Sequence, residues 1–237
     1  MKSEDPGDAQ PSPAVFAGDA VSAAVLELLS GLSVGEKLPP ERTLAADLGV
    51  SRPALRDRLR LLEALGVLRR RAGDGTYLQS LRPESLTLAL NVAIQASDLS
   101  RGALHSVRVG LERQAAREAA LAAEPVPIAY MKRALNAMAS AEHTAVDEAD
   151  IAFHQALMRS SLNSSLVFFG EALHGVLRQE ILGNRRIMHP LADDSRLMID
   201  LHEPIYAAVL AGDAEAAMRA VDGHFEGFDA LLRRLRG

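Results

Sequence analysis

The fold of the first part of this chain is decided by residues 41–66, which read ERTLAADLGVSRPALRDRLRLLEALG. The spacing of the apolar residues predicts a short helix that ends at Gly49. Ser51 stands where it can cap a second helix over residues 52–65, and the first turn of that helix tolerates Pro53. Two helices that cross steeply through a short glycine-containing turn are typical of a helix-turn-helix.

The segments on either side extend this motif to a winged helix-turn-helix over residues 14–80. Apolar residues at helical spacing predict one more helix before it, over residues 15–30. Two short extended segments follow it, at residues 67–71 and 76–79, and the glycine-rich turn between them predicts a hairpin. Helices followed by a hairpin in this order are expected to place the second helix of the motif in the major groove of DNA.

The predicted recognition helix and the strand after it carry the charge that DNA contact requires. The formal net charge of the whole chain is -5, so any basic surface has to be local. Arginine is suited to this role because it binds phosphate and reads guanine edges. A solvated helix face is the alternative, but the position between a glycine turn and a hairpin favours DNA contact. The arginines in this stretch are Arg52, Arg56, Arg58, Arg60, Arg69, Arg70 and Arg71.

The composition indicates a cytoplasmic protein. The 237-residue chain contains no cysteine, which excludes disulfides and thiolate metal ligands. Residues 1–13 are rich in Pro, Gly and acidic residues, and they predict a disordered lead-in. The N-terminus lacks the apolar core of a signal peptide, and no apolar run approaches the ~20 residues that a bilayer requires. We therefore expect no membrane contact.

Residues 81–237 form a second predicted domain. Their apolar residues recur at helical spacing almost throughout, which predicts six or seven helices and no strands. With 48% hydrophobic residues the chain can bury a substantial core. The fold class expected for the whole chain is therefore mainly α, with a winged helix-turn-helix followed by an all-α helical bundle.

Four polar residues on core-facing stripes of this second domain indicate a metal site. Asp150 and His154 lie four residues apart, so a helix places them on one face. His202 and His224 each lie at or beside the apolar face of another helix. A buried polar group without a partner costs ~1–3 kcal/mol, and a shared divalent first-row ion would satisfy all four. Three separately hydrogen-bonded histidines are the alternative interpretation. Most of the seven histidines of the chain could be surface residues.

The first domain resembles the GntR family of bacterial regulators. The resemblance rests on LPPER at 38–42, LGVSR at 48–52, LRD at 55–57, LEALGV at 62–67 and GDGT at 73–76. It implies that Arg42, Arg52 and Arg56 contact DNA and that the wing tip enters the minor groove. The chain departs from the common pattern at Asp57 and Arg58, and Arg58 is expected to alter phosphate contacts. The full set of expected DNA-binding residues is Arg42, Ser51, Arg52, Pro53, Arg56, Gly73, Asp74, Gly75 and Thr76.

Residues 86–235 resemble the FadR-type, or FCD, C-terminal domain of the same family. The landmarks are VR at 107–108, LE at 111–112, the Asp150 and His154 pair, Asn163, His202, GD at 212–213 and His224. In the metal-binding branch of that domain, the residues matching Asp150, His154, His202 and His224 bind the ion. The resemblance implies zinc first, with nickel, manganese or another first-row ion as alternatives.

The function expected from these features is that of a ligand-responsive transcriptional regulator, a repressor in the commoner family behaviour. A small carboxylate or sugar acid is expected as the effector, with Arg108 and Asn163 as its candidate anchors. One recognition helix reads few bases, so we expect a homodimer on a palindromic double-stranded operator. A metalloenzyme and a direct metal sensor are alternatives that would use the same site. Neither the effector nor the operator sequence is specified by these patterns.

Overall fold

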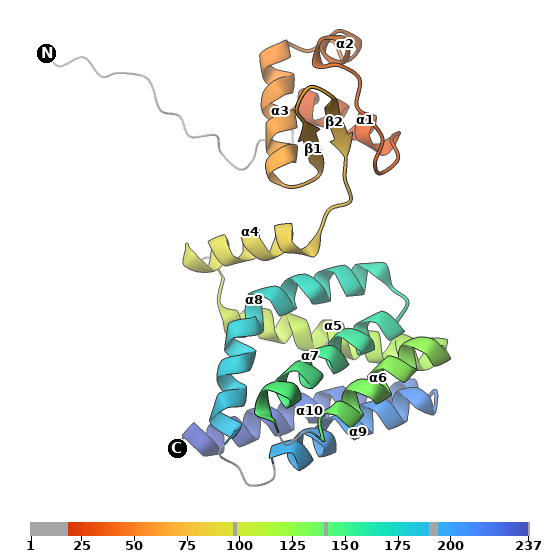
Figure 1. The fold of residues 1–237 in the computed structure, drawn as a ribbon, viewed down its shortest axis with the longest axis vertical. Coiled ribbons are helices and arrows are strands. Elements are labelled where there is room, and N and C mark those ends of the chain that lie inside the picture. Colours follow the sequence, from red (N-terminus) through yellow and green to blue (C-terminus); the bar gives the residue numbers. More distant parts are fainter. Residues whose placement is uncertain (1–18, 97–98, 140–141, 190–193, 237) are drawn as a thin grey trace, which may run out of the picture. The chain divides into compact units, whose positions relative to one another are not determined.

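The computed structural model describes residues 19–96, 99–139, 142–189 and 194–236 (Figure 1). The predicted lead-in over residues 1–13 lies outside these ranges. The chain divides into two compact units between Arg82 and Pro83. Within the described ranges, no helix is long and apolar enough to cross a bilayer.

Helices and a short hairpin make up the first unit. The helices are α1 (Ala20–Ser30), α2 (Glu41–Asp47) and α3 (Arg52–Ala64), and the strands are β1 (Leu68–Arg71) and β2 (Gly75–Leu78). The strands are antiparallel, with Leu68 opposite Leu78 and Arg71 opposite Gly75. The winged helix-turn-helix predicted from the sequence is confirmed.

The turn between α2 and α3 depends on one glycine and one cap. Gly49 has a φ of +64°, a region that residues with a Cβ rarely adopt. The Ser51 hydroxyl accepts a hydrogen bond from the Ala54 amide at 3.3 Å and so caps α3. Both helices, α1 and the hairpin then bury a common apolar core. Its members are Val25, Leu29, Leu38, Leu44, Ala45, Leu55, Leu59, Leu62, Leu68 and Leu78.

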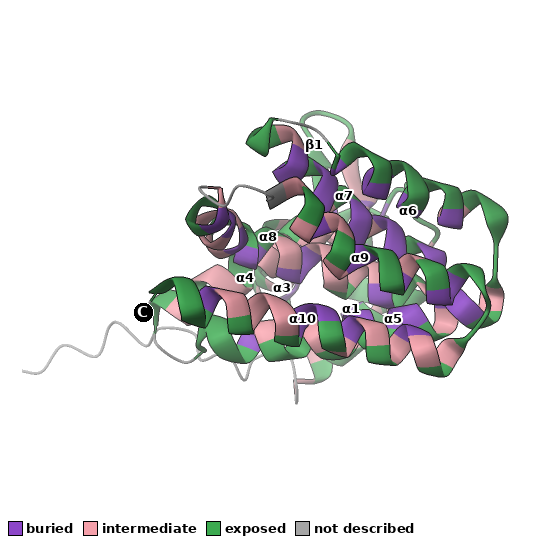
Figure 2. Cartoon of the chain, turned by 90° about the horizontal axis from the view of Figure 1, so that it is seen from below, coloured by how far each residue is buried: buried purple, intermediate pink, exposed green. Residues whose placement is uncertain are grey.

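The second unit is an all-α bundle, as predicted. Among its described residues there are seven helices and no strand: α4 (Pro83–Gln95), α5 (Arg101–Ala122), α6 (Pro125–Ala137), α7 (His143–Ser160), α8 (Ser164–Met188), α9 (Asp194–Leu210) and α10 (Ala214–Arg236). Figure 2 shows the buried residues in purple on the sides of α5, α7, α9 and α10 that face one another. The centre of this bundle is where the candidate metal ligands lie.

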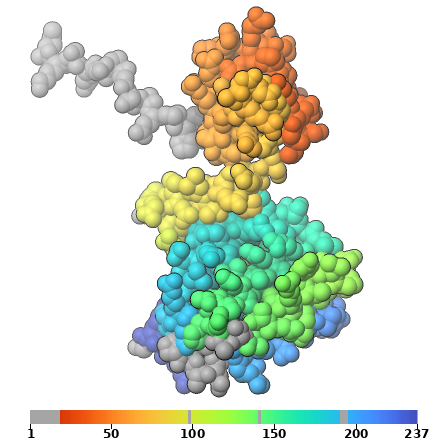
Figure 3. All heavy atoms as spheres, viewed as in Figure 1, coloured from red at the N-terminus to blue at the C-terminus, as the bar shows by residue number. Residues whose placement is uncertain are grey.

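Helix α4 packs closely on α8 because a glycine lets the two backbones approach. The Thr87 hydroxyl donates a hydrogen bond to the Ala172 carbonyl at 3.0 Å. A Cβ at Gly175 would lie only 2.8 Å from the same hydroxyl oxygen, so a larger residue there would push α4 away. In Figure 3 the yellow atoms of α4 lie directly above teal atoms at the start of α8.

Candidate metal centre and DNA-binding surface

The start of α3 presents several of the residues predicted to contact DNA. Arg52 and Pro53 are exposed in its first turn. Arg56 lies one turn further along the helix, and its side chain is 43% exposed. Arg42, in the first turn of α2, is exposed as well. These three guanidinium groups are therefore accessible to phosphate oxygens and base edges.

Glu41 joins the recognition helix to the wing. One carboxylate oxygen accepts a hydrogen bond from Arg56 Nε at 3.0 Å, and the other accepts one from Arg70 Nη2 at 3.0 Å. Burial raises the pKa of Glu41, but these two hydrogen bonds outweigh it and hold the pKa below its usual range. The carboxylate accepts this hydrogen bond from Nε of Arg56, which orients the guanidinium group. The side chain is still 43% exposed, so the guanidinium remains accessible. Glu41 did not stand out in the sequence as a functional residue.

The wing tip is braced by Asp74. Gly73 has a φ of +72°, which allows the chain to reverse there. The Asp74 carboxylate accepts hydrogen bonds from the Tyr77 hydroxyl at 2.7 Å and from Lys37 Nζ at 3.2 Å. These two bonds lower the pKa of Asp74, with the Tyr77 bond as the larger cause. Thr76 lies in β2 opposite Arg70, so the predicted wing residues Gly73, Asp74, Gly75 and Thr76 follow one another around the hairpin.

The expectation for Arg58 needs correction. Its Nη2 lies 2.7 Å from Asp19 Oδ2, and its Nε also donates to Asp19 and to the Ser22 hydroxyl. Asp19 is the N-cap of α1, so Arg58 ties the recognition helix to the first helix. The sequence around residue 58 could not indicate this partner, which lies 39 residues away. Arg58 is thus paired within the unit rather than presented as a free guanidinium.

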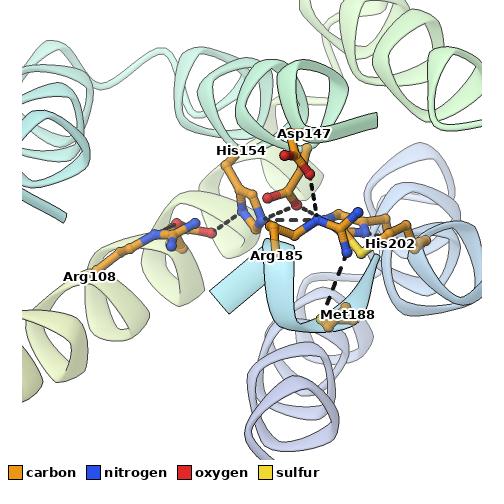
Figure 4. Close-up of polar contacts among 9 residues, drawn as sticks. Arg108, Asp147, His154, Arg185, Met188 and His202 are labelled. Atoms are coloured by element: carbon orange, nitrogen blue, oxygen red, sulfur yellow. Dashed lines mark hydrogen bonds and ion pairs between the residues drawn. The ribbon is translucent and has the colours of Figure 1, made fainter. Parts of the chain in front are cut away.

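The four predicted metal ligands meet in the bundle core. Helix α7 supplies Asp150 and His154, α9 supplies His202, and α10 supplies His224, and all four are buried. One ring nitrogen from each of the three histidines lies within 4.8 Å of the others. Asp150 Oδ1 lies 2.9 Å from His202 Nε2 and 3.5 Å from His154 Nε2. Figure 4 shows His154 and His202 turned toward each other.

Neighbouring groups orient the two best-defined imidazoles. His202 Nδ1 donates to the Met198 carbonyl at 2.7 Å, since a carbonyl can only accept. His154 Nδ1 lies 2.5 Å from Glu112 Oε2 and donates to it in the same way. In both rings Nε2 is then left facing the centre, 3.3 Å apart. A metal-binding histidine is held in this manner by a carbonyl or carboxylate on its other nitrogen.

The donor set fits a divalent first-row ion. Ligand atoms about 2.0–2.2 Å from zinc in tetrahedral or octahedral geometry lie about 3.0–3.5 Å from one another. The separations among Asp150, His154 and His202 are 2.9–3.5 Å, and the ring nitrogen of His224 lies within 4.8 Å of those of the other two histidines. His224 Nδ1 is buried and has no hydrogen-bond partner among the described residues. A shared ion would satisfy this unpaired buried nitrogen beside the two converging imidazoles. Three histidines and a carboxylate suit zinc, nickel or manganese.

The buried charged groups at the centre shift one another's pKa values. Burial raises the pKa of Asp150, but hydrogen bonds from His154 and His202 hold it well below its usual range. Burial lowers the pKa of His154, but the Glu112 carboxylate outweighs it and raises that pKa to about 9. Burial lowers the pKa of His224, and the neighbouring imidazoles lower it further. A bound cation would take the place of the proton on His154.

Glu112 links the centre to Arg108. Its Oε1 accepts a hydrogen bond from Arg108 Nε at 2.6 Å, while its Oε2 accepts the one from His154. Burial raises the pKa of Glu112, but the Arg108 charge and His154 hold it far below its usual range. Arg108 is only 7% exposed, and its guanidinium lies 5.2 Å from the Phe225 ring centroid. The candidate effector anchor is therefore buried beside the candidate metal ligands. In the sequence, Glu112 stands out only as a landmark of the FCD resemblance.

Two cavities border the centre, and both are lined by Arg108 and His154. One, of about 20 Å³, is also lined by Glu112 and His174. The other, of about 40 Å³, is also lined by Asp150, His224, His105 and Glu180; we call it the metal-side cavity. His105 and His174 are partly buried here, and the sequence pattern did not single out either residue. Burial lowers the pKa of His174 to about 4.

Asn163 lies away from both cavities. It is the N-cap of α8, where its side-chain oxygen accepts hydrogen bonds from the Ser165 and Leu166 amides at 3.0 and 3.3 Å. Its amide nitrogen donates to Glu118. The structure explains this residue as a helix cap and does not bring it to the candidate site.

A second buried ion pair holds α8 against α7. Arg185 is fully buried, and its Nε donates to Asp147 Oδ1 at 3.0 Å. Asp147 lies one turn before Asp150 on α7, and Figure 4 shows Arg185 joined to Asp147 and to Met188. This pair fixes the helix that carries two of the candidate ligands. It was not foreseen from the sequence.

Comparison with known proteins identifies both units. Residues 18–78 match the family model for "Bacterial regulatory proteins, gntR family", and residues 103–227 match that for "FCD domain". The chain is 28% identical over 207 residues to the "Putative L-lactate dehydrogenase operon regulatory protein" of Escherichia coli (strain K12), covering 86% of this chain and 80% of that protein. It is 29% identical over 204 residues to the "HTH-type transcriptional regulator LutR" of Bacillus subtilis (strain 168), covering 85% and 93%.

A solved structure has the same fold. It is described as "Streptococcus agalactiae GntR" and aligns with a TM-score of 0.60 and 24% sequence identity, covering 91% of this chain and 97% of that one.

Proposed function

Because the chain belongs to the GntR family of bacterial regulatory proteins and carries an FCD domain, we propose that it is a metal-dependent transcription factor. Two of its relatives are named as regulators, one of an L-lactate dehydrogenase operon and the other as an HTH-type transcriptional regulator. In the proposal, a divalent ion held by Asp150, His154, His202 and His224 binds a small organic or sugar acid. Binding of the acid changes the affinity of the winged helix-turn-helix for its operator.

The convergence of three imidazoles and one carboxylate is the observation that carries the proposal. Two facts support it. One ring nitrogen of each histidine lies within 4.8 Å of the other two, and the buried Nδ1 of His224 has no hydrogen-bond partner among the described residues. A bound ion acts as a Lewis acid that holds an anionic ligand. We assign zinc first and keep nickel and manganese as alternatives. Glu112 and the Met198 carbonyl hold Nε2 of His154 and His202 toward the centre, where they would bind the ion.

Arg108 supports a carboxylate as the ligand group. Its Nε is engaged by Glu112, and its guanidinium lines both cavities beside the candidate ligands. A carboxylate bound there would meet the ion and a guanidinium together, the pairing that favours bidentate recognition. The printed name of the E. coli relative refers to an L-lactate dehydrogenase operon, which supports an organic acid as the kind of effector. Asn163 has no part in this proposal.

The DNA side of the proposal rests on the exposed arginines of α2 and α3. Arg42, Arg52 and Arg56 would contact the major groove and its phosphates, with the hairpin at Gly73–Gly75 reaching the minor groove. We propose a cytoplasmic homodimer on a palindromic operator, because two half-sites about one helical turn apart match a two-fold axis. We propose that the protein represses transcription and that binding of the acid relieves this repression. No catalytic role is included.

Native mass spectrometry of the purified protein tests the proposal. We expect a dimer that carries one ion per chain, together with any acid that co-purifies. His154→Ala, His202→Ala and His224→Ala should each lose the ion, whereas His143→Ala, whose ring stacks on His189, should keep it. Full occupancy in all three ligand variants would reject the shared site. Operator binding that responds to the ion but to no acid would indicate direct metal sensing instead.

A further inference from the structure

Two polar atoms in the wall of the metal-side cavity have no partner. His105 Nε2 and Glu180 Oε2 are both inaccessible to solvent, and neither has a hydrogen bond among the described residues. His105 lies on α5, one turn before Arg108, and Glu180 lies on α8. Neither residue belongs to the proposed metal ligands or to the Arg108 and Glu112 pair. They are polar groups that the proposed function leaves unexplained.

Leaving such atoms unpaired is unfavourable, so a ligand that forms hydrogen bonds with them would be stabilised. The two atoms also determine which hydrogen-bonding groups this ligand must carry. One unsatisfied buried donor or acceptor lowers the equilibrium constant for folding or binding on the order of tenfold or more. A carboxylate can only accept hydrogen bonds, so whatever meets Glu180 has to donate. The His105 ring is held edge-on against Phe225, with centroids 5.4 Å apart, so it cannot easily turn away. The cavity therefore requires a ligand that carries a donor.

The cavity also limits the size of that ligand. Its volume is about 40 Å³, roughly three times the ~10–15 Å³ that one ordered water needs. Apolar side chains, including Leu177 and Phe225, form the rest of the wall. A chain of about three carbons between two polar ends suits this mixture of small volume, apolar wall and separate polar groups.

We propose that Glu180, with His105, binds a hydroxyl group of the effector, which makes the effector a short hydroxy acid with a hydroxyl beyond its second carbon. The inference rests on the proposed function, because the carboxylate of this acid would occupy the ion and Arg108. A hydroxyl on the second carbon can chelate the ion together with the carboxylate. A hydroxyl on the third carbon cannot do so as readily and is free to donate to Glu180.

The test compares propionate with 3-hydroxypropionate, which differ by that one hydroxyl. Calorimetry on the zinc-loaded, full-length protein gives the affinity of each acid for the wild type, Glu180→Leu and His105→Phe. Glu215→Gln, an exposed residue in the first turn of α10, is the matched control. We expect the hydroxyl to strengthen binding roughly 10-fold or more in the wild type and control, as hydrogen bonds to charged groups do.

The variants decide the assignment. In Glu180→Leu the ratio of the two affinities should fall close to one, in His105→Phe it should fall partly, and propionate should bind all variants within about threefold. A hydroxyl gain that survives Glu180→Leu, or no gain in the wild type, would overturn this inference alone. So would a Glu180-dependent gain for 3-aminopropionate without one for 3-hydroxypropionate. If neither acid bound in a zinc-dependent manner, the proposed function would fail as well.

Discussion

Glu112 couples the proposed effector anchor to the proposed metal ligand, and Glu112→Gln tests that coupling. The carboxylate is 3% exposed and accepts hydrogen bonds from Arg108 at 2.6 Å and His154 at 2.5 Å. A glutamine offers one acceptor oxygen, so its NH₂ group must face one of these two donors. Loss of a carboxylate that orients a metal-binding histidine lowers metal affinity about 10- to 100-fold. Breaking the buried pair should also destabilise the fold by ~3 kcal/mol.

Competition between the protein and a chromogenic zinc chelator measures the affinity, and urea unfolding of the metal-free protein measures the stability. Glu118→Gln is the matched control, since Glu118 lies on the same helix and bonds Gln114 and Asn163 outside the cavities. We expect the control to keep wild-type zinc affinity. If Glu112→Gln bound zinc as tightly as wild type, Glu112 would not orient His154 toward an ion, and the reasoning would be refuted.

Three further predictions concern DNA recognition and the effect of the ion. Arg52→Ala or Arg56→Ala should weaken binding to a selected operator duplex by ~1–3 kcal/mol in fluorescence anisotropy, and unchanged affinity in both would remove α3 from the interface. Glu41→Gln should reduce the preference for operator over unrelated duplex because Arg56 loses its brace; an unaltered preference would contradict that positioning role. Zinc at 100 times its Kd should stabilise wild type and His143→Ala by about 2.7 kcal/mol in calorimetric unfolding, but not His224→Ala. Equal stabilisation of all three would place the ion elsewhere.

The winged helix-turn-helix could be predicted because its determinants are local in sequence. Gly49 supplies the positive φ of the turn and Ser51 the cap of the next helix, and each is recognisable within a few residues. The all-α second unit could be predicted for the same reason, since the apolar spacing of each helix is visible in the sequence. Asp150 and His154 were found because they share a helix face.

Contacts between elements far apart in the sequence were not predictable from periodicity. Arg58 was expected near phosphate, but its partner Asp19 is on another helix. Glu112 is four residues from Arg108, so their pairing could have been read as an i,i+4 ion pair, whereas its bond to His154 joins two helices. Asn163 precedes Ser164 at a helix start, a capping signal that the sequence does contain.

The central claim is that an acid bound at the metal centre changes operator affinity. Calorimetric binding of the tightest acid to zinc-loaded protein, with and without saturating operator DNA, tests it most directly. Linkage requires that if the acid weakens DNA binding by some factor, DNA weakens acid binding by the same factor. A coupling of ~1–3 kcal/mol predicts that the acid binds the DNA-bound protein 5- to 150-fold more weakly than the free protein. Removing the zinc with a chelator should abolish this difference. Equal acid affinity with and without operator would contradict the account.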